Sequence, residues 1–98
     1  MKNQTSEEVK EVVLEEELVS TGNQSQLIVY NDDVNTFEWV IQCFMEILNH
    51  SFEQAEQLSL IIHFTGKASV KKATFEELKP KKEALIDRGL SAVIESMV

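Results

Sequence analysis

Between residues 37 and 48 the hydrophobic side chains recur in steps of three and four residues, which is the spacing of one face of an α-helix. The members of this stripe are Phe37, Val40, Ile41, Phe44 and Leu48. Further hydrophobic residues widen the same face: Trp39, Cys43, Met45 and Ile47. The pattern predicts that this segment is the central helix of the fold and that its stripe lies in the core.

Two further helices are predicted from hydrophobic spacing and from boundary residues. Three pairs have the spacing of a capping box, in which a capping residue is followed three positions later by Glu or Gln: Asn35 with Glu38, Ser51 with Gln54, and Thr74 with Glu77. The second helix ends at Gly66 and turns four residues inward: Ala55, Leu58, Ile61 and Ile62. The third helix ends near Gly89. Since Pro80 lies about six positions into it, either the helix is kinked there or its regular part begins near Lys79.

Short runs rich in β-branched and aromatic residues predict strands over residues 27–30, 68–73 and 91–95. The predicted order is therefore strand, helix, helix, strand, helix, strand. Three strands with these spacings indicate a small α+β domain, with one sheet and helices packed on it. We assign residues 26–98 to this domain. Residues 1–25 carry six glutamates against two lysines and are predicted to form a flexible acidic arm.

Composition narrows the classes of function. The chain has 98 residues, enough for one small domain, and a formal net charge of -8. This charge argues against binding to nucleic acid and to anionic membranes, because both attract clustered positive charge. The single cysteine, Cys43, falls in the hydrophobic helical pattern, so a reducing compartment is favoured over a disulfide framework. No signal peptide or membrane span is recognisable, and a soluble cytoplasmic protein is predicted.

Three consecutive hydrogen-bond acceptors, Asn31, Asp32 and Asp33, stand between the first predicted strand and the first predicted helix. One interpretation is turn chemistry, which Asn and Asp favour, with carboxylates stabilised near the positive end of a helix dipole. The other is capture of an ammonium group, which the N–H groups of a helix repel. Spacing alone favours the turn. Beside a hydrophobic helix, however, these acceptors suit a free protein N-terminus with a bulky first side chain.

The two histidines have alternative interpretations as well. His63 lies three residues before Gly66, where a positive charge is favourable near the end of a helix. Alternatively, a neutral ring nitrogen of His63 accepts a hydrogen bond from an amine. His50 is predicted to lie at the surface between two helices. One thiol gives no zinc cage and no glycine-rich phosphate loop occurs, so we predict no metal, no cofactor and no enzymatic activity.

In their order and spacing these motifs resemble the ClpS family, adaptor proteins that deliver substrates with an N-degron to a Clp protease. The resemblance covers residues 27–95 and rests on VYNDD and TFE in residues 29–38, on SFEQAE and IH in residues 51–63, and on GKA and GL at residues 66–68 and 89–90. It implies a three-stranded antiparallel sheet with three helices. The chain is expected to act as a monomer.

The resemblance implies a role for ten residues in a binding pocket. The α-amino group of the substrate is held by Asn31, Asp32 and His63, with Asp33 beside them. Six residues form the rest of the pocket: Asn35, Phe37, Val40, Ser59, Ile62 and Leu90. Asn35 occupies a position that is often Thr in the family. Phe37 stands where many members carry a gating Met, and Ser59 where a Met commonly lines the pocket. These exchanges change the pocket's shape, which leaves the preference among phenylalanine, tyrosine, tryptophan and leucine open.

The resemblance further implies that Glu76 and Lys81 dock on the N-terminal domain of a Clp AAA+ unfoldase, which is ClpA-like or ClpC-like. The acidic arm takes part in handing over the substrate. The predicted function is therefore an adaptor that binds substrate proteins with a bulky hydrophobic N-terminal residue and delivers them for degradation. The alternative is a plain protein-interaction domain with a small α/β fold like that of the ribosomal stalk protein, and without an N-degron pocket.

Overall fold

The computed structural model describes residues 24–97, which form six elements in the predicted order. They are β1 (Gln24–Tyr30), α1 (Phe37–Leu48), α2 (Phe52–Thr65), β2 (Lys67–Thr74), α3 (Phe75–Asp87) and β3 (Ser91–Ser96). The predicted α+β class, with three helices and one three-stranded antiparallel sheet, is confirmed. Apart from Gln24 and Ser25, the predicted arm lies outside the described residues.

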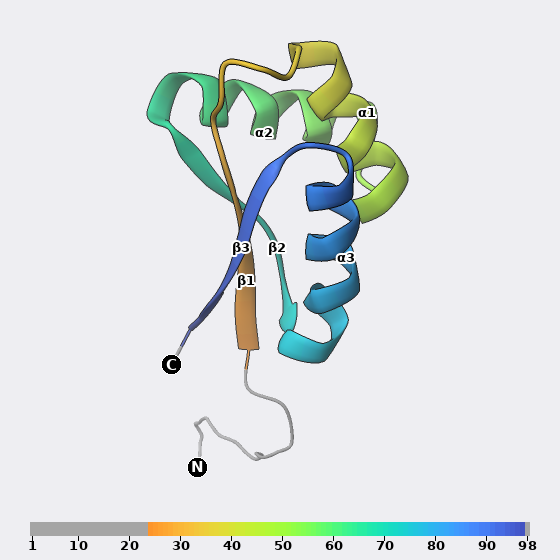
Figure 1. Cartoon of the computed structure of the whole chain (residues 1–98), viewed down its shortest axis with the longest axis vertical. Coiled ribbons are helices and arrows are strands. Elements are labelled where there is room, and N and C mark those ends of the chain that lie inside the picture. The colour runs from red at the N-terminus through yellow and green to blue at the C-terminus, as the bar shows by residue number, and fades with distance from the viewer. Residues whose placement is uncertain (1–23, 98) are drawn as a thin grey trace.

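β1 is the middle strand of the sheet and pairs antiparallel with β2 on one side and β3 on the other (Figure 1). It begins three residues earlier than predicted, so Gln24 and Ser25, which the prediction placed in the arm, belong to this strand. Ser25 pairs with Ala73 of β2 and with Ser96 of β3. Backbone pairing on both sides holds this polar start of the strand, although its side chains carry no strand signal.

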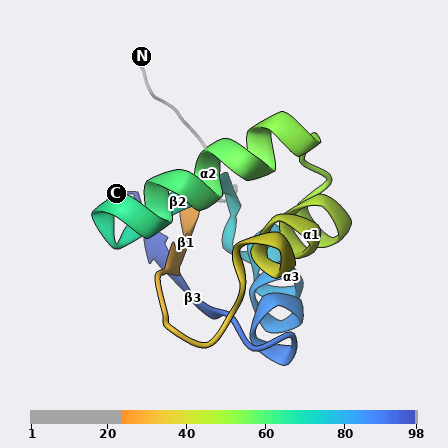
Figure 2. The same cartoon turned by 90° about the horizontal axis from the view of Figure 1, so that it is seen from above.

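The helices cover the sheet from one side and from one end. In Figure 1, α3 runs alongside the strands, whereas α2 lies across the end at which β1 finishes. Seen from above, the segment between β1 and α1 arches over that same end (Figure 2). The largest fully buried side chains come from β1, α1 and α3: Phe44, Leu27, Leu78, Leu85, Val29 and Cys43. The segment that follows β1 therefore lies at the same end of the sheet as α2.

The predicted helix stripes are only partly buried. In α1 the later members, Ile41, Phe44 and Leu48, are in the core. In α2, Ala55 and Ile62 are buried as predicted, but Ile61 is exposed and Ser59 is buried in its place. The inward face of α2 is therefore rotated away from its most hydrophobic face.

Cys43 is buried on α1, and this burial raises the pKa of its thiol, in line with the prediction of a structural cysteine.

Two of the three predicted capping residues are confirmed. Ser51 and Thr74 accept hydrogen bonds from the backbone N–H groups of Gln54 and Glu77. Asn35 was the wrong choice for α1, because Thr36 is the cap and its hydroxyl accepts from the N–H of Trp39 at 3.1 Å. Each such cap contributes about 1 kcal/mol to stability. The side chain of Asn35 is thereby free for contacts elsewhere.

Pro80 does not mark the beginning of a helix. α3 begins at Phe75, directly after its cap, and continues through Pro80 to Asp87, so the predicted start near Lys79 is wrong. The missing N–H of proline leaves the carbonyl of Glu76 without its helical partner. Glu76 and Pro80 are both exposed, and water can serve that carbonyl instead.

His50 is partly buried, contrary to the predicted surface position. Its ring meets the ring of Phe44 edge-on with the centroids 6.2 Å apart. Its Nδ1 is buried and has no hydrogen-bond partner among the described residues. Burial, and then the positive charge of Lys71, lower the pKa of His50, so the neutral ring is the favoured form in the fold.

Candidate functional site

A cavity of about 570 Å³ opens beside the end of β1, within the size range of ligand pockets. Its walls come from the end of β1 and the following segment, the first turn of α1, the last turns of α2, and the residue before β3. All ten residues predicted to form the pocket line this cavity: Asn31, Asp32, Asp33, Asn35, Phe37, Val40, Ser59, Ile62, His63 and Leu90. The fold thus brings together positions up to 59 residues apart; what each does to a ligand stays a prediction.

The lining residues divide by exposure into a floor and a rim. The buried ones, which form the floor, are Val29, Ser59, Ile62 and Leu90. The exposed ones, which form the rim, are Asn31, Asp33, Leu60, His63 and Phe64. The floor is hydrophobic except for one hydroxyl group, while the rim carries carboxylate, amide and imidazole groups beside the hydrophobic side chains of Leu60 and Phe64. A ligand held here meets polar atoms at the rim and mainly hydrophobic ones at depth.

One backbone hydrogen bond brings the rim together. The N–H of Asn31 donates to the carbonyl oxygen of Gly66 at 2.9 Å. Gly66 ends α2 with φ of 101°, a conformation that side chains with a β-carbon disfavour. The end of α2 is thereby fastened to the end of β1, and His63, one turn before Gly66, lines the same cavity as Asn31.

One carboxylate oxygen of Asp32 accepts hydrogen bonds within the turn that follows β1. Its Oδ1 accepts hydrogen bonds from the backbone N–H groups of Val34, at 2.9 Å, and Asn35, at 3.0 Å. The backbone bond from Asn35 is the main reason why the pKa of Asp32 is lowered, so this carboxyl is charged at neutral pH. The turn interpretation of Asp32 is therefore correct for Oδ1. Among the described residues, Oδ2 accepts only from the side-chain amide of Asn35, at 3.0 Å, and keeps capacity for a further donor.

Asn35 connects this turn to the other wall of the cavity. Its Nδ2 donates to both carboxylate oxygens of Asp32 and, at 2.9 Å, to the carbonyl oxygen of Gly89. Gly89 has φ of 94° and is followed directly by Leu90 on the cavity floor. Asn35 therefore positions two walls relative to each other, a role that its predicted place in the hydrophobic pocket did not include.

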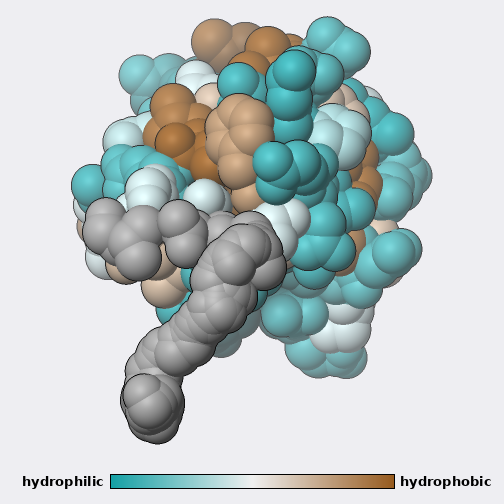
Figure 3. All heavy atoms as spheres, turned by 90° about the horizontal axis from the view of Figure 1, so that it is seen from below, coloured by the Kyte–Doolittle hydropathy of each residue, from teal (hydrophilic) through white to brown (hydrophobic). Residues whose placement is uncertain are grey.

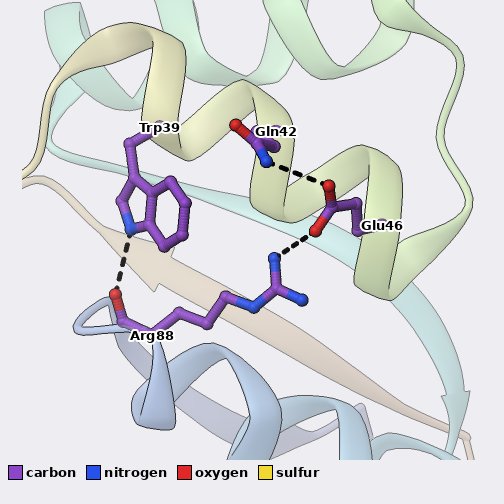
Figure 4. Close-up of polar contacts among 4 residues, drawn as sticks. All are labelled: Trp39, Gln42, Glu46 and Arg88. Carbon is purple, nitrogen blue, oxygen red and sulfur yellow. Dashed lines mark hydrogen bonds and ion pairs between the residues drawn. The ribbon is translucent and has the colours of Figure 1, made fainter.

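A second set of contacts fastens α1 to the turn between α3 and β3 (Figure 4). The indole Nε1 of Trp39 donates to the carbonyl oxygen of Arg88 at 3.0 Å. The guanidinium of Arg88 reaches back to the carboxylate of Glu46, which also accepts from the side-chain amide of Gln42. This surface ion pair is worth little by itself. Its effect is to hold Arg88 and Gly89 against α1, which fixes the cavity wall at Leu90.

Four lining residues were missed in the sequence: Val29, Tyr30, Leu60 and Phe64. Phe64 is 77% exposed, and its ring meets the ring of His63 edge-on with the centroids 5.0 Å apart. Leu60, His63 and Phe64 are spaced three and four residues apart and share one helix face. From that spacing Leu60 and Phe64 were predictable as lining residues, once His63 had been assigned to the site.

Within residues 24–97, no three histidine, cysteine or acidic side chains lie close enough together to hold a metal ion. None of the helices in this part of the chain is long and hydrophobic enough to cross a membrane.

Comparison with known proteins decides the family. The family model described as "ATP-dependent Clp protease adaptor protein ClpS" matches residues 20–93. The chain belongs to the ClpS family. ClpS proteins are adaptors for the Clp protease and are not enzymes themselves. This membership favours the adaptor over the plain interaction domain that the sequence left as its alternative.

Individual ClpS proteins agree with this assignment. The ClpS adapter of Campylobacter jejuni subsp. doylei is 33% identical over 79 residues, which are 81% of this chain and 82% of that protein. The ClpS adapter of Streptomyces avermitilis is 34% identical over 68 residues, or 69% of this chain and 65% of that protein. A solved structure of Agrobacterium tumefaciens ClpS2 bound to L-phenylalaninamide matches the fold with a TM-score of 0.71 at 20% identity, over 76% of this chain and 98% of that one.

Proposed function

We propose that this ClpS-family chain binds proteins whose first residue has a free α-amino group and a bulky hydrophobic side chain, and that it delivers them to a Clp AAA+ unfoldase for degradation. The observation that carries the proposal is the placement of hydrogen-bond acceptors on the rim of a cavity with a hydrophobic floor. A protein N-terminus has the matching order of groups, with an ammonium next to a side chain. No other common group in a protein presents a cation so close to a phenyl or isobutyl group.

The ammonium is assigned to the rim. In this proposal it donates to the free side of the Asp32 carboxylate, to the side-chain oxygen of Asn31 and to a neutral ring nitrogen of His63. Asp33 adds negative charge beside them. Charge-assisted hydrogen bonds contribute about 1.5–3 kcal/mol each. An α-amino group with a pKa of about 7.7–8.0 is mostly charged at neutral pH.

The first side chain is assigned to the floor. Burying one phenylalanine or leucine side chain against Val40, Ile62 and Leu90 contributes about 1.5–3 kcal/mol. Association costs several kcal/mol in lost freedom. The balance predicts affinity in the micromolar range, which suits a protein that must hand its substrate on. Phe37, partly buried at the start of α1, lines the cavity, and in this proposal its bulk limits which first residues fit. The phenylalaninamide in the Agrobacterium tumefaciens structure, a free amine next to a benzyl group, supports this ligand class.

A fluorescence titration with peptides that differ only in their first residue tests the proposal. Peptides that begin with phenylalanine, tyrosine, tryptophan or leucine are expected to bind. Those that begin with alanine or aspartate are expected to bind at least about tenfold more weakly, because they leave the floor unfilled or bring a charge to it. Equal affinity for all first residues contradicts the proposal. A peptide with the same sequence from its second residue onward, preceded by glycine, is the control for contacts outside the cavity.

For the partner we propose docking on the N-terminal domain of a ClpA-like or ClpC-like unfoldase through Glu76 and Lys81 of α3. Glu76 is exposed and Lys81 partly exposed, about one and a half helical turns further on. Both lie outside the cavity lining, so a substrate and an unfoldase fit at the same time. Figure 3 looks at the end of the molecule where β1 and α3 begin, and hydrophilic side chains there surround a hydrophobic patch, a composition found in reversible protein contacts.

Charge reversal tests this docking surface. The double variant Glu76→Lys with Lys81→Glu is expected to lose capture by an immobilised unfoldase N-terminal domain, because both charges then oppose their partners. The same variant is expected to keep its peptide affinity. The matched control is Glu53→Lys, a charge reversal in the exposed first turn of α2. Unchanged capture of the double variant places the docking surface elsewhere.

The proposal includes a monomer in the cytoplasm, where the single thiol of Cys43 stays reduced. One copy of the chain already supplies a complete cavity wall, and the binding site needs no residue from a second copy.

A further inference from the structure

The hydroxyl group of Ser59 is a polar atom without a partner. Ser59 is 3% exposed, and its Oγ is buried and makes no hydrogen bond to the described residues. A serine inside a helix ordinarily bonds back to the carbonyl four residues earlier or points to water. Neither applies here. A buried hydroxyl left unpaired costs about 1–3 kcal/mol, and most buried polar groups in proteins have a partner. This group therefore calls for an explanation.

Ser59 lies on the cavity floor, directly below the rim. It precedes His63 by four positions on α2, so both residues share one helix face about 6 Å apart along the axis. The other buried lining residues, Val29, Ile62 and Leu90, have hydrophobic side chains. Ser59 is thus the one polar side chain on this described floor, among residues more deeply buried than the proposed amine-binding side chains.

We infer that the Ser59 hydroxyl recognises a polar atom at the far end of the first side chain, and that this chain prefers an N-terminal tyrosine to an N-terminal phenylalanine. The inference rests on the proposed function and adds to it a specificity-determining residue. A phenol hydroxyl both donates and accepts, as does serine, so the two groups satisfy each other. The position of the Ser59 hydroxyl depends on a single side-chain torsion, so the group can reorient without a movement of α2.

The expected selectivity follows from what each ligand leaves unpaired. With tyrosine bound, both hydroxyl groups are paired. With phenylalanine or leucine bound, the Ser59 hydroxyl stays unpaired, as it is in the free chain. One neutral hydrogen bond of this kind gives tyrosine an advantage of about three- to tenfold.

The test is the ratio of two dissociation constants. Two peptides that are identical except for tyrosine or phenylalanine at the first position are titrated against the wild-type chain and Ser59→Ala. We expect tyrosine to bind about three- to tenfold more tightly to the wild type and the ratio to fall to about one in the variant. A third peptide that begins with 4-methylphenylalanine has nearly the shape of tyrosine without its hydroxyl and is expected to lose the advantage.

Each outcome is decisive. A ratio near one in the wild type, or an equal ratio in the wild type and Ser59→Ala, overturns the inference. A ratio that persists for 4-methylphenylalanine assigns the preference to shape instead and also overturns it. If neither tyrosine nor phenylalanine binds the wild type, the proposed function itself fails. Thermal unfolding of Ser59→Ala serves as the folding control, since alanine is the better helix former.

Discussion

Acetylation of the α-amino group of a peptide that begins with phenylalanine is expected to abolish its measurable binding. The acetyl group removes the positive charge and at least two charge-assisted hydrogen bonds to the rim. At about 1.5–3 kcal/mol each, their loss weakens binding by at least about 100-fold. The acceptors Asn31, Asp32 and His63 are then covered by a ligand that cannot pair with all of them, which adds a desolvation cost.

Fluorescence anisotropy with a labelled peptide measures this effect. The control is the same peptide acetylated on the side chain of an internal lysine, which changes the peptide's charge equally but leaves the α-amino group free. Its affinity is expected to stay within about twofold, because an exposed charge away from the cavity contributes little. Equal binding of the free and the α-acetylated peptide rules out recognition of an N-terminus.

The second large effect is expected from Asp32→Asn. The amide oxygen of asparagine can still accept from the backbone N–H groups of Val34 and Asn35, so the turn is retained. The negative charge that faces the ammonium is lost. We expect affinity for the phenylalanine peptide to fall by about 10- to 100-fold, the value of one charge-assisted hydrogen bond. The midpoint of thermal unfolding is expected to fall much less than in Asp32→Ala, which also removes the turn contacts.

Two further variants separate charge from turn. Asp87→Asn, at the exposed end of α3, removes one negative charge at a residue outside the cavity lining and is expected to bind the peptide like the wild type. Asp32→Ala is expected to lose both binding and stability. If Asp32→Asn binds as tightly as the wild type while Asp32→Ala is destabilised, the carboxylate serves the turn alone.

The difference between Asn35 and Thr36 shows why local patterns were not sufficient for this site. Asn35 followed by Glu38 has the spacing of a capping box, yet Thr36 makes the cap. The amide of Asn35 instead bonds to the carbonyl of Gly89, 54 positions away in the sequence. A capping pattern describes competition within one turn of helix, and it carries no information about a partner that only the folded chain brings near.

Ser59 makes the same point for burial. The hydrophobic residues of α2 predicted that Ile61 faces inward, whereas the structure buries Ser59 and exposes Ile61. The inward face of α2 is determined by its packing on α1 and β2 and by the bond from Asn31 to the carbonyl of Gly66 at its end. That rotation put a hydroxyl on the cavity floor.

The amino-acid sequence by itself determined the six elements and most of their ends, because periodicity, caps and positive-φ glycines act over four residues or fewer. It also determined which chemical groups were available. Through the family motifs, it indicated the ten positions predicted to form the pocket. Only the tertiary structure decided that these groups surround one cavity, with acceptors outside and hydrophobic side chains within. A cavity is space between segments that contact one another across the fold, and its shape depends on contacts such as those of Asn31 with Gly66 and Trp39 with Arg88.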